Sequence, residues 1–280
     1  MKTSNRKPKA YENLAFLKGA AGREMRILSE FIEPFSRFRK ERITDTIVFF
    51  GSARVKPLKD AKADLTLIER QIKKNKRSNK KLFEKYEKLK VAFQMSKYYE
   101  EAQKLSYLIT SWAKTLNHGH RFVICSGGGP GIMEAANRGA LKSGGKSIGL
   151  NISLPHEQLP NPFITEELNF EFHYFFMRKF WFMYLAKAMV IFPGGFGTMD
   201  EMMEVLTLLQ SGKIQKNLTV VLYGTDYWTK IINFQEMIRL GVIAKDDMKI
   251  FKFCDSPEET YEYLKTEITK NVLARKTITL

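Results

Sequence analysis

Short apolar runs and longer polar-to-apolar segments alternate along most of this chain. The short runs are rich in β-branched and aromatic residues and end in glycine or polar residues, as buried strands do. Seven strands are therefore predicted, within residues 46–54, 121–131, 146–152, 168–174, 189–195, 218–224 and 249–254.

The segments between these runs are long enough for helices. We expect helices at about 95–118, 130–143, 175–188, 198–212, 227–240 and 257–270. Strands that alternate with helices of ten or more residues form βαβ units, in which the strands are parallel and helices cover both faces of the sheet. The predicted fold class is therefore α/β.

Two segments lie outside this alternation. The predicted organisation is an N-terminal helical arm at 1–42 and a domain at 43–280 that carries an insertion at 57–93. Residues 27–38 have apolar residues at helical spacing, so the arm should pack on the domain or on a second subunit. The insertion interrupts the passage from the first strand to its helix. It could extend that helix or form a helical hairpin.

The net charge of +16 is concentrated in these two segments. Residues 1–42 hold 11 Lys or Arg against 5 Asp or Glu, and residues 57–93 hold 12 against 5. The rest of the chain is close to neutral, which weakens a nucleic-acid interpretation based on net charge alone. The insertion is interpreted first as a solvated helix face, with a nucleic-acid or partner surface as the alternative.

Composition and hydropathy indicate a globular protein of the cytoplasm. Hydrophobic residues make up 44% of the 280 residues, and the two cysteines are too few for a disulfide framework. The basic start precedes no long apolar region, so no secretory signal is predicted. Residues 174–192 are apolar over about one bilayer span, but charged residues interrupt them. We expect a buried helix and a strand there and no membrane association.

Three glycine-bearing turns follow predicted strands, after residues 50, 125 and 193. In open parallel sheets, ligands bind outside the carboxyl ends of the strands. The three turns should therefore meet at one edge of the sheet.

The third turn, "PGGFGTMDE", has the composition of a phosphate-binding turn. Glycines let the backbone approach an anion, and free N–H groups at a helix start point towards it. The amides from Gly194 to Thr198, which include Gly195 and Gly197, would form the cradle, with the Thr198 hydroxyl as a further donor. Thr198 and Glu201 could also form a plain capping box. A capping box, however, does not explain three glycines and a proline.

Other chemistries are not favoured. "SGGGPGIMEAAN" has Ile132 where the dinucleotide fingerprint needs its third glycine, and "ALKSGGKS" lacks the first glycine of a P-loop. The histidines show no metal spacing, the cysteines have no nucleophile context, and no G-x-S-x-G elbow occurs.

What remains is a set of carboxylates and cations. Glu201 lies beside the phosphate turn, Glu134 is on the second helix, and Arg178 and Lys179 lie among aromatic residues in "FFMRKFWF". Charges in such surroundings are costly to bury unless they are paired. The alternative is that Arg178 and Lys179 extend to the surface.

Several of these motifs together resemble one known family. "PGGFGTMDE" fits the P-G-G-x-G-T-x-x-E signature of the LOG proteins, cytokinin riboside 5′-monophosphate phosphoribohydrolases that were long described as lysine decarboxylases. "FFGSAR" resembles the family's first strand and turn, "GGGPGIMEAANRGA" its second, and "MRK" its Arg-Lys pair. The resemblance covers about 43–56 and 95–255.

The resemblance implies a Rossmann-like fold and hydrolysis of the N-glycosidic bond of a nucleoside 5′-monophosphate, without a cofactor or metal. By the family's pattern, Arg178 and Glu201 would be catalytic. The remaining candidates would bind substrate and its phosphate: Gly194, Gly195, Gly197, Thr198, Ser52, Arg54, Gly128, Gly129, Glu134 and Lys179.

The chemistry agrees with that implication. Glycosidic cleavage passes through an oxocarbenium-like state, which a carboxylate stabilises, and a carboxylate can also orient the attacking water. Longer bacterial members act on ordinary purine nucleotides, so AMP is expected before a prenylated (cytokinin) nucleotide. A homodimer or larger homo-oligomer is also implied. The alternatives are a non-catalytic nucleotide-binding regulator on the same fold, and a nucleic-acid-associated protein that uses residues 57–93.

Overall fold

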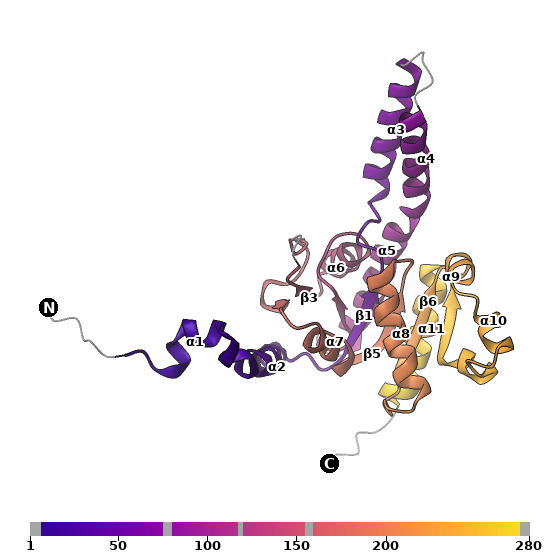
Figure 1. Ribbon diagram of the computed structural model, residues 1–280. Coiled ribbons are helices and arrows are strands. Elements are labelled where there is room, and N and C mark those ends of the chain that lie inside the picture. Colours follow the sequence, from indigo (N-terminus) through magenta and orange to yellow (C-terminus); the bar gives the residue numbers. More distant parts are fainter. Residues whose placement is uncertain (1–6, 75–79, 117–119, 155–158, 275–280) are drawn as a thin grey trace.

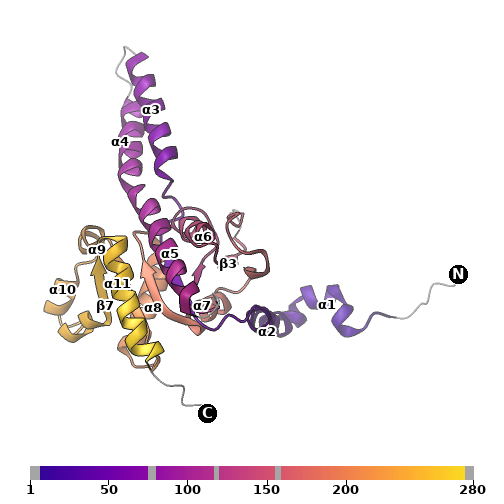
Figure 2. The ribbon, with the colours of Figure 1, turned by 180° about the vertical axis from the view of Figure 1, so that it is seen from behind.

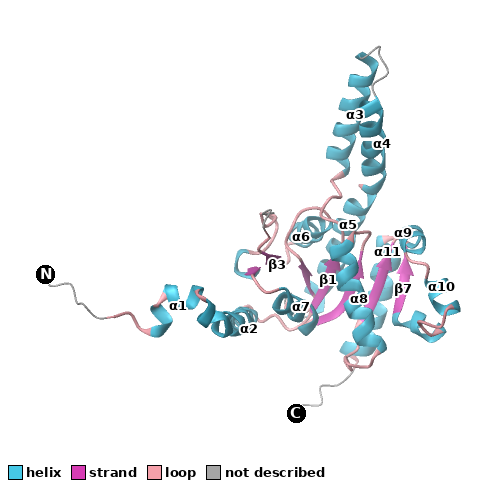
Figure 3. Ribbon diagram, in the orientation of Figure 1, coloured by secondary structure: helices cyan, strands magenta, loops and turns pink. Residues whose placement is uncertain are grey.

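The computed structural model describes residues 7–74, 80–116, 120–154 and 159–274. Within these ranges the chain forms one seven-stranded parallel sheet with helices on both faces (Figures 1 and 3). The α/β, Rossmann-like fold class is therefore confirmed. The strands are β1 Thr46–Phe50, β2 Val123–Ser126, β3 Ser147–Ile152, β4 Asn169–Phe172, β5 Ala186–Ile191, β6 Thr219–Tyr223 and β7 Phe251–Cys254.

The helices flank this sheet and extend beyond it. The α-helices are α1 Leu14–Lys18, α2 Arg23–Lys40, α3 Leu58–Lys74, α4 Lys80–Met95, α5 Lys97–Leu116, α6 Ile132–Lys142, α7 Phe175–Tyr184, α8 Phe196–Gln210, α9 Thr225–Ile231, α10 Phe234–Arg239 and α11 Pro257–Ile268. Shorter 3₁₀ or π turns are η1 Ala10–Glu12, η2 Ala20–Gly22, η3 Glu166–Leu168, η4 Lys245–Ile250 and η5 Thr269–Leu273. No helix in the described ranges is both long and apolar enough to cross a membrane.

All seven predicted strands form, but several helix boundaries differ from the prediction. The helix expected at 175–188 ends at Tyr184, because β5 already begins at Ala186. The helix expected at 227–240 is two helices. The side chain of Asn233 accepts a hydrogen bond from the Glu236 N–H, 3.0 Å away, and so caps the start of α10.

The strand order places β1 at the centre of the sheet. The order is β4-β3-β2-β1-β5-β6-β7, and every neighbouring pair is parallel. From β1 the chain builds outwards through β2 to β4, then returns to β5 on the other side of β1. This reversal between β1 and β5 is a topological switch point, where crevices open at the carboxyl ends of strands.

Alternate residues of β1 belong to two separate cores. Val48 and Phe50 face a core that includes side chains of α7 and α8, and Ile47 and Phe49 face one built with α5, α6 and α11. All four side chains are buried. Because both faces are covered, residues 47–50 are all apolar instead of alternating with polar residues.

The basic insertion forms a helical hairpin that also extends a helix. Helix α4 runs almost directly into α5, with Ser96 between them, and α3 lies beside α4. Both views show this pair standing away from the sheet (Figures 1 and 2). The insertion therefore both extends α5 and forms a helical hairpin, which were the two alternatives considered from the sequence.

The N-terminal arm packs on α7, and Pro34 lies inside its main helix. A proline in a helix lacks the N–H that would bond to the carbonyl four residues earlier, here that of Glu30. The indole Nε1–H of Trp181 donates to this freed carbonyl oxygen at 2.9 Å. The Glu30 carboxylate in turn accepts hydrogen bonds from the N–H groups of His173 and Tyr174, just before α7 begins. The arm therefore holds the start of the helix that carries Arg178.

Candidate active site

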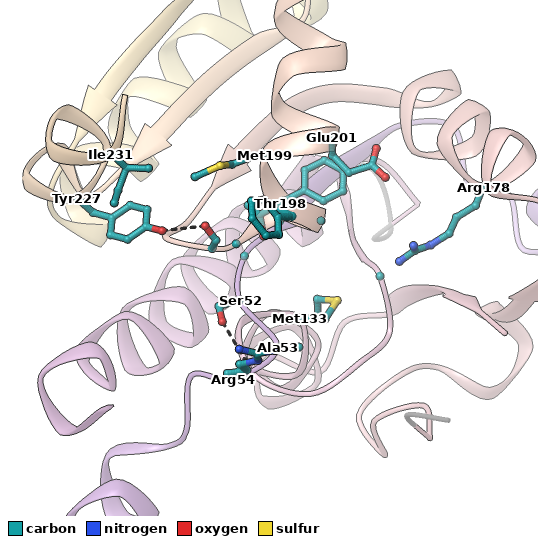
Figure 4. A pocket seen from close by; sticks show the side chains of 17 residues that line it. Ser52, Ala53, Arg54, Met133, Arg178, Thr198, Met199, Glu201, Tyr227 and Ile231 are labelled. Carbon is teal, nitrogen blue, oxygen red and sulfur yellow. Dashed lines mark hydrogen bonds between the residues drawn. The ribbon is translucent and has the colours of Figure 1, made fainter. Parts of the chain in front are cut away.

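A cavity of about 640 Å³ lies at the switch point, at the carboxyl ends of β1, β2 and β5. The three predicted glycine turns all contribute to its wall (Figure 4). Its lining comprises Phe50, Gly51, Ser52, Ala53, Arg54, Gly127, Met133, Arg178, Gly194, Gly195, Phe196, Gly197, Thr198, Met199, Glu201, Tyr227 and Ile231.

The β5–α8 turn presents an open helix start to this cavity. Helix α8 begins at Phe196, and its N-cap is Gly195, which provides no side-chain cap. The first N–H groups of a helix have no intrahelical acceptor. A Cβ added at Gly195 or Gly197 would meet no atom within 4 Å, so the space beside these amides is open. The positive end of α8 and its free N–H groups form a suitable cradle for a phosphate.

The capping box considered from the sequence is absent from this turn. Because α8 begins two residues before the predicted position, Thr198 is its third residue, and Glu201 lies on the second turn. The Thr198 N–H bonds instead to the Gly195 carbonyl oxygen at 3.0 Å.

Close packing holds the rest of this turn in place. A Cβ at Gly194 would lie 2.1 Å from the Thr198 Oγ1, so only glycine allows the Thr198 side chain to pack there. The Tyr227 hydroxyl donates to the Gly194 carbonyl oxygen at 2.8 Å (Figure 4).

Arg178 reaches the cavity from α7 and is fixed by the neighbouring strand. Its Nε–H donates to the Leu150 carbonyl oxygen at 2.7 Å, and its guanidinium lies over the Phe182 ring. A Cβ at Gly127 would lie 2.6 Å from the Arg178 Nη2, so this glycine makes room for the guanidinium. Burial lowers the pKa of Arg178, and the charge of Glu201 opposes this effect. Arginine nevertheless remains a cation at neutral pH.

Glu201 faces the same cavity from α8 (Figure 4). Its side chain is 12% exposed. Burial raises the pKa of Glu201 to about 6, although Lys179 and Arg178 both act to lower it. A carboxylate that titrates close to neutrality beside an arginine is typical of functional sites.

Lys179 lies behind Glu201 and contacts three carboxylates. Its Nζ is 2.8 Å from an Asp200 oxygen, 2.6 Å from Glu204 and 3.6 Å from Glu201. Burial alone would lower the pKa of Lys179, but its hydrogen bonds to Asp200 and Glu204 outweigh burial and raise it. Lys179 does not line the cavity, so it has no direct route to a substrate there.

The β1 turn contributes Ser52 and Arg54 to the opposite wall. The Ser52 N–H donates to the Pro193 carbonyl oxygen at 3.0 Å, which ties this turn to the β5–α8 turn. The Ser52 hydroxyl accepts from the Arg54 N–H at 3.1 Å. The exposed Arg54 side chain is thereby attached to a rigid loop beside the phosphate cradle.

Three further candidates also lie outside the cavity lining. Gly128 and Gly129 are buried, and their carbonyl oxygens accept hydrogen bonds from Asn161. Gly128 has a φ of +74°, and a Cβ there would collide with Asn151. The Glu134 carboxylate accepts a hydrogen bond from the Tyr99 hydroxyl at 2.6 Å and lines a neighbouring hollow. In these positions the two glycines shape the fold behind the site.

The cavity also contains residues that the sequence did not indicate. Phe50, Met133, Met199, Tyr227 and Ile231 add large apolar or aromatic side chains to its lining. Their positions relative to the strands could have identified two of these residues. Phe50 is the last residue of β1, and Tyr227 follows β6, which lies next to β5 in the sheet. Their convergence depends on the strand order, which the residue pattern does not contain.

In the described ranges, no three His, Cys, Asp or Glu side chains are grouped so as to hold a metal ion. His118 and His156 lie outside those ranges.

Part of the chain that contains this site matches a known protein family. Residues 133–264 match the family model described as "Possible lysine decarboxylase". This range contains Arg178, the β5–α8 turn and Glu201. The resemblance to the LOG-like family is confirmed. The matched residues include β3 to β7 and the cavity residues Met133, Arg178, Glu201, Tyr227 and Ile231.

Solved structures also align with the chain. The structural-genomics protein TM1055 is 19% identical over 79% of this chain and 99% of its own, with a TM-score of 0.46. The molybdenum cofactor carrier protein from Chlamydomonas reinhardtii is 15% identical over 80% of this chain and 99% of its own, with a TM-score of 0.40. Among curated proteins, none matches the chain. Alignments at these scores do not bear on ligand or activity.

Proposed function

We propose that the protein is a nucleoside 5′-monophosphate phosphoribohydrolase, which cleaves an N-glycosidic bond to release a free base and ribose 5-phosphate. The observation that carries the proposal is the joint placement of Arg178 and Glu201 on a cavity that also contains the open start of α8. A phosphate anchor and a buried carboxylate about one to two helical turns apart suit the two ends of a ribose 5-phosphate.

In the proposed reaction, three parts of the cavity have different roles. The N–H groups of Phe196 and Gly197, with the Thr198 hydroxyl, would hold the 5′-phosphate. Arg178 would orient the ribose or phosphate as a fixed cation. Ionised Glu201 would stabilise the oxocarbenium-like state as the C1′–N bond breaks, and would orient a water molecule. The water oxygen bonds to C1′ and the departing base nitrogen gains a proton, which balances the reaction.

The apolar part of the wall suits a planar base. Phe50, Met133, Met199 and Ile231 could contact its faces. We propose AMP as the first substrate to examine, since the family resemblance favours purine nucleotides. None of the described residues that line the cavity is a lysine, and Lys179 is engaged by three carboxylates, so these residues offer no amine for the Schiff base of a decarboxylase. A homo-oligomer is also proposed on the resemblance, and sedimentation velocity tests it.

The direct test is base release from a panel of nucleoside monophosphates, followed by chromatography. Wild-type protein should release base, and Glu201→Gln and Arg178→Ala should each abolish release. The matched control is Glu262→Gln, which neutralises an exposed carboxylate on α11 and should retain activity. If the wild type binds monophosphates but releases no base, the hydrolase proposal is wrong and a nucleotide-binding regulator replaces it.

A further inference from the structure

The cations of α3 are gathered on one side of the helix. At 100° per residue, all of its lysines and arginines fall within an arc of about 120°. The acidic residues Asp60, Asp64 and Glu69 lie outside that arc, and Asp64 pairs with Lys56 at 2.7 Å. The cations, each exposed, are Lys59, Lys62, Arg70, Lys73 and Lys74. An ordinary solvated face mixes charges of both signs, so this separation calls for another explanation.

The opposite side of α3 is already occupied. Ala61 and Ile68 are 2% and 1% exposed, and α3 contacts both α4 and α5. A helix that lies on a membrane uses its apolar side to enter the lipid. Here that side is packed inside the protein, so what α3 offers to a partner is its cationic side alone.

The dimensions of this cationic side suit a regular polyanion. From Lys59 to Lys74 it extends over about 22 Å, at 1.5 Å per residue. A shallow groove on it is lined by Lys59, Lys62 and Arg70 together with Ala63, Thr66 and Leu67. Leu67, at 57% exposed, is the large apolar side chain that this groove presents. Protein interfaces usually place buried aromatic anchors at their centre, whereas nucleic-acid backbones are bound by repeated Lys and Arg contacts to phosphates.

The position of the hairpin leaves room for a long ligand. Figures 1 and 2 show α3 and α4 projecting from the sheet. The residues that line the candidate active site all lie outside these two helices. We propose that the cationic side of α3 binds the sugar-phosphate backbone of a nucleic acid without sequence preference. The proposal is independent of the hydrolase activity, because none of its residues lines the candidate active site.

The test compares two triple variants that remove the same charge. In one, Lys62, Arg70 and Lys73 become alanine; in the other, the exposed Lys213, Lys230 and Lys245 become alanine. Fluorescence anisotropy with a labelled single-stranded RNA and a labelled DNA duplex, each of roughly 20 nucleotides or base pairs, measures affinity from about 50 to 200 mM salt. Circular dichroism melting establishes that each variant folds.

Wild-type protein should bind at least one probe, with affinity that falls steeply as salt rises. The α3 triple variant should bind at least about tenfold more weakly and show a salt slope lower by about two to three. The control triple should stay within about twofold of wild type, and Glu201→Gln should bind normally. Equal losses in both triples, or no binding of either probe at low salt, would overturn the proposal. Equally effective competition by polyglutamate would assign the surface to an acidic protein instead.

Discussion

At the scale of single residues, the ionisation of Glu201 links stability to activity. Burial raises its pKa to about 6 from the ordinary value of 4.5. The proposed mechanism needs the ionised form, so kcat/KM should fall as the pH decreases through about 6. Glu201→Gln should reduce the rate by roughly 10²- to 10⁴-fold above pH 6, and by less below it, where the wild-type side chain is also neutral. A pH–rate profile of the wild type checks this prediction, and loss of activity above pH 6 instead would make Glu201 an acid.

The same raised pKa predicts that Glu201→Gln stabilises the protein. A carboxyl group whose pKa rises on folding favours the folded state when protonated and disfavours it when ionised. The penalty is therefore present above pH 6 and disappears as the pH falls towards 4.5. The neutral Gln should raise the free energy of unfolding by about 2 kcal/mol at neutral pH, and by less near pH 4.5. Urea unfolding at both pH values measures the difference.

Lys179 is expected to act through Glu201 and not on the substrate. Lys179→Met removes a cation that lowers the pKa of Glu201 and leaves three carboxylates close together. The acidic limb of the pH–rate profile should therefore move to higher pH, while the rate at alkaline pH is largely retained. Lys179→Arg keeps the charge and should keep the limb near 6. An unchanged limb in Lys179→Met would contradict this role.

The two glycines on either side of the start of α8 should respond differently to alanine. Gly197 lies within the helix and faces open space, so Gly197→Ala should stabilise the fold by about 0.5–1 kcal/mol. It should nevertheless weaken phosphate binding, because the new methyl group occupies the proposed cradle. Gly194→Ala should destabilise the fold through its collision with Thr198. Thermal melting with and without AMP separates the two effects. If Gly197→Ala leaves the affinity for the nucleotide unchanged, the phosphate does not bind at this turn.

At the scale of elements, the arm and α7 form one unit that positions Arg178. Glu30→Ala removes the acceptor for the N–H groups of His173 and Tyr174 and a negative charge near the start of α7. We expect a loss of about 1 kcal/mol of stability and a larger relative loss of kcat/KM. Chemical denaturation and steady-state kinetics test this, with the exposed Glu24→Ala on the same helix as the control. Equal kinetics in the two variants would show that α7 needs no support from the arm.

Element types followed closely from the pattern of residues, but some helix boundaries did not. The strands were predictable because burial on both faces demands continuous apolar runs such as residues 47–50. The spacing of residues 27–38 predicted the helix around Pro34, but the partners that support that helix, and the early start of α8, come from distant parts of the chain. Trp181 supplies the donor that makes the proline tolerable, and Tyr227 holds the turn from which α8 begins.

At the scale of the whole molecule, the strand order brings the site together. The reversal between β1 and β5 places the Ser52 turn beside the Gly194–Thr198 turn, linked through the Pro193 carbonyl. Helix α7 contributes Arg178 to the lining of the same cavity. The same architecture places the hairpin outside the sheet, where its charge is free for another partner.

The sequence by itself determined the α/β class, the seven strands and the phosphate-type turn, because each depends on neighbouring residues. A short apolar run, a glycine-rich turn and a helix start are all local features. Only the tertiary structure decided that Lys179 holds carboxylates, that Gly128 and Gly129 lie behind the cavity, and that Tyr227 and Met133 belong to its wall. It also decided that the cations of α3 share one outward side. These properties depend on which elements pack together, and packing joins residues that are far apart in the chain.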